Sequence, residues 1–191
     1  KEFPYLDQEK TGKAVIYLDT AATSQKPSCV IDAVDNFYRY SNANPHRGAH
    51  YLGWKATEVC ENTRAKVQKF IGAQRPEEIV YTRNATESLN LVAYSYALDK
   101  LKKDDEILIT ILEHHANLVT WQMVAKRTGA KLKYVYLNDD YSLDYDDFKE
   151  KINDKTKIVA FTAASNVTGE MVDLKKVIGR AHEKGAIAVV D

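Results

Sequence analysis

The sequence contains few of the residues that mark disulfide-stabilised or metal-binding proteins. It has only two cysteines, Cys29 and Cys60, and their separation matches no common spacing of metal ligands. We therefore expect two buried, unpaired thiols in a reducing compartment, and no metal site. An excess of either charge is also absent, since 27 basic and 27 acidic residues give a formal net charge of zero. This balance predicts no nucleic-acid partner and no attraction to an anionic membrane surface.

Long apolar stretches are missing as well. No run approaches the roughly 20 apolar residues that span a bilayer, and Lys1 to Asp7 lack the apolar core of a signal peptide. We therefore expect a cytoplasmic protein without a membrane partner. The remaining composition is that of a globular protein: 191 residues, 45% hydrophobic and 28% charged, are enough for one sizeable core.

Strands and helices alternate through the second part of the sequence. Short apolar runs typical of buried strands lie at residues 78–82, 106–110, 132–136, 157–161 and 186–190. Helical patterns follow them through Leu89 to Val92, Leu118 to Ala125, Asp144 to Ile152 and Asp173 to His182. This alternation predicts right-handed crossovers and an α/β fold with a mostly parallel sheet.

The first part of the sequence follows a less regular plan. A small strand is expected at 15–19, and a helix at 28–40 with Val30, Ala33, Val34, Phe37 and Tyr38 on one face. Asn, Pro and Gly indicate a loop at 41–48. A long helix is expected from about Tyr51 to Ile71, where Gly72 ends it as a C-cap.

Ligands of open α/β sheets bind at the carboxyl ends of the strands, so the residues that follow each strand are site candidates. After the first predicted strand, Asn84 and Glu87 flank Ala85 and Thr86 in a capping-box arrangement. The segment either only caps a helix or forms a phosphate cradle from first-turn amides, the small Ala85 and the Thr86 hydroxyl. It lacks the glycines of a dinucleotide-binding loop.

Two further strand ends carry polar side chains. His114 and His115 follow the second strand, but neighbours on extended backbone point to opposite faces, so we expect no metal chelate there. The imidazole either stacks on an aromatic cofactor or is an ordinary surface histidine. After the fourth strand, Asn166 either binds a ligand oxygen or belongs to an Asn-Gly-type turn.

Asp191 is the acid at the end of the last strand. It either caps a following helix or holds a proton on a heterocyclic nitrogen in the crevice above the sheet. A phosphate anchor, a stacking ring, an amide and an acid together fit pyridoxal 5'-phosphate (PLP) better than a nucleotide. Because a domain does not normally end at such a strand, we expect the front part of a larger enzyme.

These residues resemble the class V aminotransferase superfamily of fold-type I PLP enzymes, and within it the group II cysteine desulfurases and selenocysteine lyases. The similarity runs nearly from end to end. The segments that carry it are Tyr17 to Pro27, His46 to His50, Ala85 to Glu87, Glu113 to Gln122, Ser165 to Gly169 and Val189 to Asp191.

The resemblance implies a role for each candidate residue. Ala85 and Thr86 are similar to the pair that binds the cofactor phosphate, and His114 to the ring that stacks on the pyridine and acts as an acid or base. By the same resemblance, Asn166 contacts the phenolic oxygen of the cofactor and Asp191 pairs with its ring nitrogen. The residues that the resemblance places at the substrate or the dimer interface are Ala22, His46 and Arg47.

The resemblance also implies a fold and a reaction. The expected fold is the N-terminal part of a three-layer fold-type I PLP-dependent transferase. Residues 1–60 would contribute to a small domain or dimer interface, and residues 61–191 would begin the large PLP-binding domain. The complete enzyme would remove sulfur from L-cysteine as an enzyme persulfide and release alanine. The alternatives are a selenocysteine lyase, another class V PLP enzyme, or an inert scaffold with the same fold.

The implied partners are a second copy in a homodimer and a sulfur-acceptor protein, within sulfur metabolism and iron–sulfur cluster assembly. The Schiff-base lysine, an arginine for the substrate carboxylate and a nucleophilic cysteine are expected beyond residue 191. We therefore expect the isolated 191 residues to be inactive.

Overall fold

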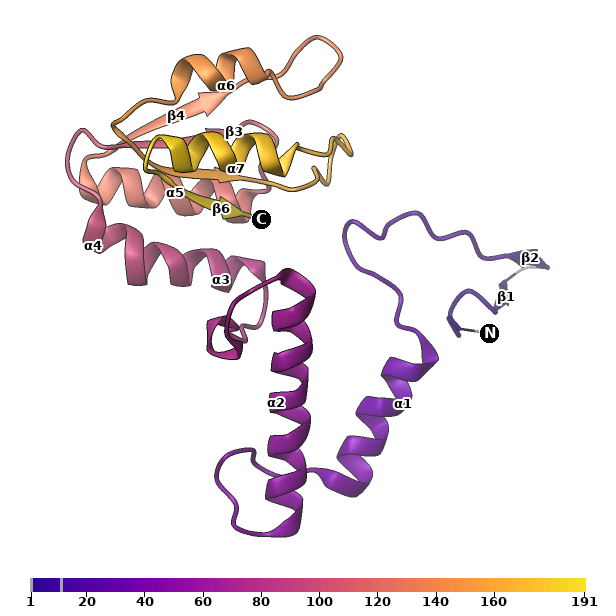
Figure 1. Ribbon diagram of the computed structural model, residues 1–191. Coiled ribbons are helices and arrows are strands. Elements are labelled where there is room, and N and C mark those ends of the chain that lie inside the picture. Colours follow the sequence, from indigo (N-terminus) through magenta and orange to yellow (C-terminus); the bar gives the residue numbers. More distant parts are fainter. Residues whose placement is uncertain (1, 11) are drawn as a thin grey trace. The chain divides into compact units, whose positions relative to one another are not determined.

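The computed structural model describes residues 2–10 and 12–191, and the chain divides into two compact units, residues 1–81 and 82–191. The second unit contains the parallel sheet, and the first is mainly helical (Figure 1). Within the described residues, no helix is both long enough and apolar enough to cross a membrane. The predicted division into family domains at residue 60 stays a prediction.

Residues 82–191, all of them described, form a four-stranded parallel sheet in the order β4-β3-β5-β6. Its strands are β3 (Glu106–Thr110), β4 (Lys131–Val135), β5 (Thr156–Phe161) and β6 (Ile187–Val190). These bounds lie within one residue of those predicted, and the predicted α/β fold is confirmed. Because the strands are parallel, the chain leaves β3, β5 and β6 at the same edge of the sheet.

Helices cover both faces of this sheet and bury two separate clusters of side chains. On one face α6 (Tyr145–Lys151) and α7 (Leu174–Glu183) pack against Leu108, Val159 and Phe161. On the other face α5 (His115–Thr128) packs with the segment from α3 (Ala85–Val92) through the π-helical turn η3 (Ala93–Ala97) to α4 (Leu98–Lys100). Ile107 and Ile109 point to this second face, whereas Leu108 points to the first, as the two-residue period of a strand requires. Figure 1 shows α6 and α5 on opposite sides of the sheet.

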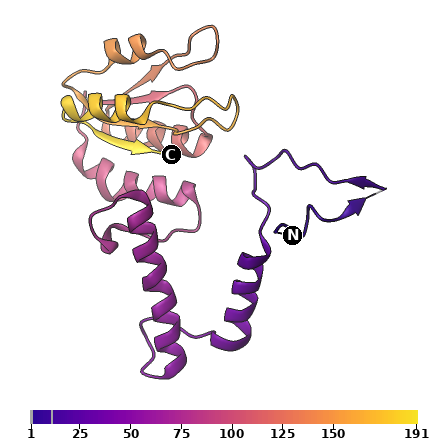
Figure 2. The ribbon, with the colours of Figure 1, turned by 45° about the vertical axis from the view of Figure 1, so that its right-hand side comes forward.

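The first unit contains the long helix α2 (Tyr51–Ile71), with the predicted bounds. It ends at Gly72, whose φ of +73° is the left-handed conformation that glycine adopts at a C-cap. Before it come the two-residue strands β1 (Glu9–Lys10) and β2 (Lys13–Ala14), the helix α1 (Ser28–Asn36) and the π-helical turn η1 (Phe37–Ser41). The loop that follows η1 folds back beside the first turns of α2 (Figure 2).

Two predicted strands are wrong. Residues 15–19 form no strand, and their Ile16 and Leu18 are 82% and 90% exposed. Residues 78–82 begin in the 3₁₀ turn η2 (Pro76–Glu78) and continue as unpaired extended chain. A strand needs a partner for its backbone N–H and C=O groups, and no described strand pairs with either segment.

The predicted apolar face of α1 and the predicted burial of the cysteines also differ from the structure. None of the α1 residues is buried, although the helix itself forms as expected. Both cysteines are free, but Cys29 is exposed and Cys60 half-buried, so the expectation of two buried thiols is wrong. Helical periodicity places residues on a face, whereas burial of that face depends on what packs against it.

Candidate functional site

The first turn of α3 forms the predicted cap. Asn84 is the N-cap residue, and its side-chain oxygen accepts the Glu87 backbone N–H at 2.9 Å. The Glu87 carboxylate reaches back to the Arg83 N–H at 2.7 Å, one residue before the position of a standard capping box. Its hydrogen bonds with the side chain and backbone of Arg83 lower the pKa of Glu87. The helix therefore begins at a fixed position.

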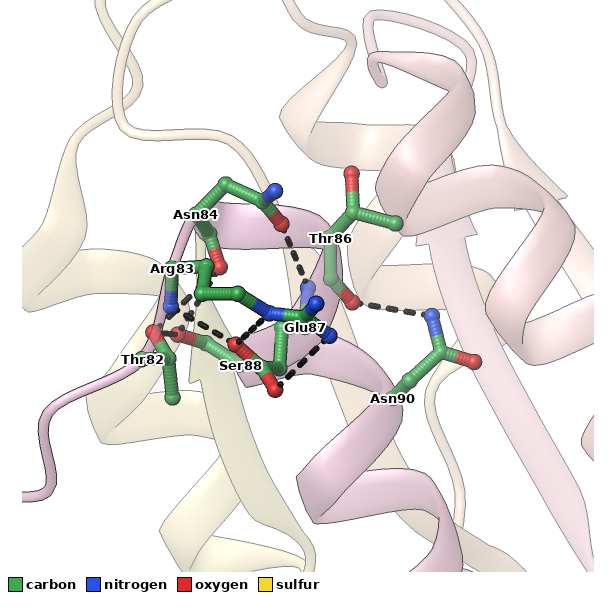
Figure 3. A network of polar contacts seen from close by, with 7 residues as sticks. All are labelled: Thr82, Arg83, Asn84, Thr86, Glu87, Ser88 and Asn90. Carbon is green, nitrogen blue, oxygen red and sulfur yellow. Dashed lines mark hydrogen bonds and ion pairs between the residues drawn. The ribbon is translucent and has the colours of Figure 1, made fainter.

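The predicted phosphate-binding residues lie beside this cap and remain accessible. Ala85 and Thr86 are exposed, and the Thr86 side chain points away from the capping network (Figure 3). The first-turn amides of a helix have no intrahelical partner and carry the positive end of the helix dipole. This turn therefore offers backbone and hydroxyl donors to an anion.

The start of α3 and the start of α5 line one cavity. Its volume is about 200 Å³, and Thr86, Asn90, His115 and Ala116 are among the residues that line it. Asn90 of α3 links the two helices, because its Nδ2 donates to Thr120 Oγ1 of α5 at 3.2 Å. The same Nδ2 also donates to the Thr86 carbonyl within α3 at 2.8 Å. The first turn of α3 is thereby placed next to the residues that follow β3.

A network centred on Glu113 joins the carboxyl ends of β3 and β5. Its carboxylate accepts the Thr162 backbone N–H at 3.1 Å, the Asn117 Nδ2 at 2.6 Å and the Thr110 hydroxyl. Asn117 is fully buried, and its Oδ1 accepts the Trp121 indole N–H at 2.6 Å. The network therefore fixes the backbone at the sheet edge from β3 to β5.

Burial raises the pKa of the Glu113 carboxyl, and the negative charge of Asp191 raises it further, while the three hydrogen bonds oppose the shift. Sequence reasoning assigned Glu113 no role, although it directly precedes His114. Its position at the end of a buried strand was the signal that could have identified it.

His114 lies at the N-terminus of α5, where it is the N-cap residue. Its Nδ1 accepts the Ala116 N–H at 3.1 Å, so the proton of the neutral imidazole is assigned to Nε2. The ring is exposed and lies 6.2 Å from the His115 ring, centroid to centroid. Its predicted contact with a cofactor ring stays a prediction.

Asp191 lies next to the end of β5. Its backbone N–H donates to the Phe161 carbonyl at 2.9 Å, and its carbonyl accepts the Ala163 N–H at 2.8 Å. These bonds continue the β5–β6 ladder and place Asp191 at the same sheet edge as Glu113, in agreement with the electrostatic effect of Asp191 on Glu113.

Asn166 lies in a tight turn after β5. Ser165 organises this turn, because its Oγ accepts the Val167 and Thr168 N–H groups at 3.3 Å and its carbonyl accepts the Gly169 N–H. Gly169 has a φ of +76°, which a glycine adopts without strain. Asn166 itself is exposed, so its amide is accessible to a ligand.

The second unit thus carries His114, Asn166 and Asp191 on segments that follow strands at one edge of its sheet, and Ala85 and Thr86 at the start of α3, beside the start of α5. The other three predicted residues belong to the first unit. Ala22 lies in a turn, where its N–H donates to the Asp19 carbonyl at 3.2 Å, and His46 and Arg47 lie in the exposed loop before α2. Their predicted place at the substrate or dimer interface stays a prediction.

This three-layer α/β domain places a helix N-terminus, an imidazole, an amide and a carboxylate near the carboxyl ends of its strands, where open α/β sheets hold their ligands. The chain belongs to the family Aminotransferase class-V, which matches residues 16–191.

Relatives cover the whole chain. It is 50% identical over 191 residues to a probable cysteine desulfurase of Synechocystis, and 46% identical over 190 residues to one of Vibrio cholerae. The chain spans 46% and 47% of these two relatives, so it corresponds to about half of their length.

Two solved structures also resemble the chain over most of its length. The cysteine desulfurase CsdA of Escherichia coli is 42% identical with a TM-score of 0.81, over 92% of this chain and 44% of that protein. The apo cysteine desulfurase of Thermococcus onnurineus is 42% identical with a TM-score of 0.88, over 93% of this chain and 44% of that protein.

Proposed function

We propose that this chain forms one wall of the active site of a PLP-dependent cysteine desulfurase. The enzyme would remove sulfur from L-cysteine as an enzyme persulfide and release alanine. The observation that carries the proposal is the arrangement of His114, Asn166 and Asp191 after three adjacent parallel strands, with the α3 N-terminus beside α5. The names and identities of the relatives support the choice of reaction.

The residues present fit the chemistry of PLP. The exposed first turn of α3 offers amide donors and the Thr86 hydroxyl to a phosphate. The Asp191 carboxylate suits a protonated ring nitrogen, and the Asn166 amide suits a ring oxygen. When bound, the cofactor supplies an electron sink for the α-carbon of an amino acid.

Side chains of this chain would hold and move protons around that group. Asp191 would keep a proton on the ring nitrogen, because a carboxylate stabilises the cation beside it. Nδ1 of His114 is occupied by the helix cap, so proton transfer would take place at Nε2. Glu113 would act as a positioning residue, because its hydrogen bonds fix Thr162 and Asn117 rather than the ligand.

The finer features of the proposal come from the family resemblance. They are a homodimer, a protein that accepts the persulfide sulfur, a place in sulfur metabolism with iron–sulfur cluster assembly as a pathway, and a cytoplasmic location. His46, Arg47 and Ala22 would contact the substrate or the second subunit in that assembly.

The proposal is tested with the full-length protein that contains this chain. Given L-cysteine and a thiol reductant, it should release alanine and sulfide in equal amounts, because the reductant supplies the two electrons that convert the persulfide sulfur to sulfide. Asp191→Ala should lower this rate by about 100-fold or more, as expected for loss of a group that controls a proton. The exposed Asp139→Ala is the matched control and should keep the rate.

Three outcomes would overturn the assignment. Protein without a visible absorbance band and without PLP released by alkali would indicate a scaffold. Preferential release of selenium from L-selenocysteine would indicate a selenocysteine lyase. Equal loss of activity in the Asp139 control would show that Asp191 has no special role.

A further inference from the structure

A second cluster of side chains lies in the first unit, between the loop after η1 and the middle of α2. His46 Nε2, Cys60 Sγ and a carboxylate oxygen of Glu61 all lie within 4.8 Å of one another. His46 Nε2 is 3.4 Å from Glu61 Oε1. The imidazole and the carboxylate are about half exposed, and the thiol is half-buried, so the cluster is open to solvent on one side.

The backbone of the loop holds His46 in place. His46 has a φ of +63°, an unusual conformation for a residue with a side chain, and its N–H donates to Thr57 Oγ1 at 2.9 Å. Thr57 is anchored in turn, because its hydroxyl donates to the Gly53 carbonyl at 2.8 Å. Cys60 and Glu61 follow Thr57 by three and four residues, so all three lie on one face of α2.

Close packing of two glycines brings the loop onto the helix. A Cβ atom added to Gly53 would lie 2.9 Å from the Gly48 Cα and from its carbonyl oxygen, nearer than a Cβ atom approaches backbone atoms in proteins. Any larger residue at Gly53 would therefore push the loop, and His46 with it, away from α2. The position of the imidazole depends on this contact.

Other groups hold the backbone of Cys60 and the side chain of Glu61. The Tyr81 hydroxyl donates to the Cys60 carbonyl at 3.0 Å. Arg64 forms an ion pair with Glu61 at 3.3 Å, and its guanidinium also donates to the Ile79 carbonyl. Partners that hold the ligands in place are a regular feature of metal sites, because they fix the direction of each donor atom.

We propose that His46, Cys60 and Glu61 bind a divalent transition metal of the zinc type. An imidazole nitrogen, a thiolate and a carboxylate are the ligands that Zn²⁺ takes, whereas Mg²⁺ and Ca²⁺ take oxygen ligands. In a tetrahedral zinc site the ligand atoms lie about 3.3 to 3.8 Å apart. The His46–Glu61 separation of 3.4 Å lies in this range, and the separations from Cys60 Sγ, at most 4.8 Å, would have to shorten by up to about 1 Å. The exposed side leaves a fourth position for water. Binding releases the thiol proton, because the metal takes the thiolate.

This site was not predicted from the sequence, which led us to expect no metal. His46 and Cys60 are separated by 14 positions and match no ligand spacing, and only the fold of the loop brings them together. The proposal goes beyond the desulfurase reaction, because it concerns metal binding within the first unit, at a loop whose His46 is also proposed to lie at the substrate or the dimer interface.

Co²⁺ titration of the full-length protein tests this proposal, with L-cysteine absent. One equivalent should produce the near-ultraviolet thiolate-to-cobalt band and the visible bands of tetrahedral cobalt, and Zn²⁺ should displace both. Cys60→Ser should abolish the thiolate band. Cys29→Ser, which removes the other cysteine of the chain, is the matched control and should keep it.

Two further variants keep the thiol and test the remaining ligands. His46→Gln and Glu61→Gln should each weaken Zn²⁺ binding about tenfold or more, measured by competition with a chromophoric chelator. Circular dichroism of every variant shows whether the fold is kept. A thiolate band that persists in Cys60→Ser, or binding that is unchanged in both other variants, would overturn the proposal.

Discussion

At Glu113, one carboxylate joins the segment between β3 and α5 to the distant segment that follows β5. It contacts the hydroxyl of Thr110, the amide of Asn117 and the backbone of Thr162. Its raised pKa is caused by burial first and by the charge of Asp191 last. A carboxyl group whose pKa is higher in the folded than in the unfolded state holds its proton more tightly when folded. Its contribution to stability is therefore present at low pH and lost as the pH rises through the raised pKa.

We expect Glu113→Gln to flatten this pH dependence. Between the ordinary value of 4.5 and the raised pKa, the free energy of unfolding of the wild type should fall with pH, because Glu113 is ionised in the unfolded state but keeps its proton in the folded state. In Glu113→Gln this part of the pH dependence should be absent, because glutamine does not ionise. The variant also loses the Asn117 hydrogen bond at every pH, a constant cost of about 1 to 3 kcal/mol. Urea unfolding over a pH series measures both effects.

Glu87→Gln provides the control of opposite sign. Hydrogen bonds from Arg83 lower the pKa of Glu87, so its contribution is present above the ordinary value and lost as the pH falls through the lowered pKa. In Glu87→Gln, the free energy of unfolding should therefore no longer show the part of its fall that Glu87 causes below about pH 4.5. The same effect of both variants on the same side would contradict the assigned pKa directions.

Among single residues, the site candidates at strand ends were predictable, whereas the residues that hydrogen-bond around them were not. His114, Asn166 and Asp191 follow apolar runs that can be recognised in the sequence. The contacts of Glu113 with Thr162, 49 positions away, exist only because β3 and β5 are neighbours. The cluster of His46, Cys60 and Glu61 could not be predicted either, because it also depends on contacts between separate segments.

At the scale of elements, side-chain caps begin four α-helices of the second unit. Asn84, His114, Asp144 and Asp173 are the N-cap residues of α3, α5, α6 and α7, and each accepts a first-turn backbone N–H. Caps of this kind satisfy amide groups that the helix itself leaves unpaired. They therefore set where each of these helices begins.

Replacing the cap of α3 should loosen the proposed phosphate-binding turn. Asn84→Ala should lower the free energy of unfolding by about 1 kcal/mol, because the Glu87 N–H loses its acceptor. Asn84→Asp keeps a side-chain acceptor and should keep most of the stability. Chemical denaturation measures both variants, and an equal loss in the two would show that the cap contributes nothing.

Elements with their own local signals were predicted well. The bounds of α2 and the Gly72 C-cap, and the strands from β3 to β6, follow from apolar period and turn residues. The strands expected at 15–19 and 78–82 failed because a strand is defined by its partner. An apolar run shows only that a segment is able to join a sheet. No described strand pairs with residues 15–19 or with residues 78–82.

At the scale of the second unit, two apolar layers on opposite faces of one sheet provide the core. Phe161 is fully buried in the layer under α6 and α7, and Trp121 is fully buried in the layer under α5. Each strand contributes to both layers in alternation. A large cavity in either layer should therefore weaken the whole sheet and its site.

Phe161→Ala should lower the free energy of unfolding by about 3 to 5 kcal/mol, the usual cost of removing a buried aromatic ring. Val167→Ala removes an apolar side chain that is 83% exposed in the turn after β5, and should change it by less than about 0.5 kcal/mol. Thermal and urea unfolding measure both. Similar losses in the two variants would show that the model of the core is wrong.

The sequence by itself determined the alternation of strands and helices, the parallel sheet and the residues at the strand ends, because these depend on local period, caps and turns. Only the tertiary structure decided which of these residues lie together. It joined Glu113 to the end of β5 and brought His46 next to Cys60. It also left the apolar face of α1 unburied. The reason is physical: hydrogen bonds, burial and ligand geometry depend on distances between residues far apart in the chain, and these distances are set by packing.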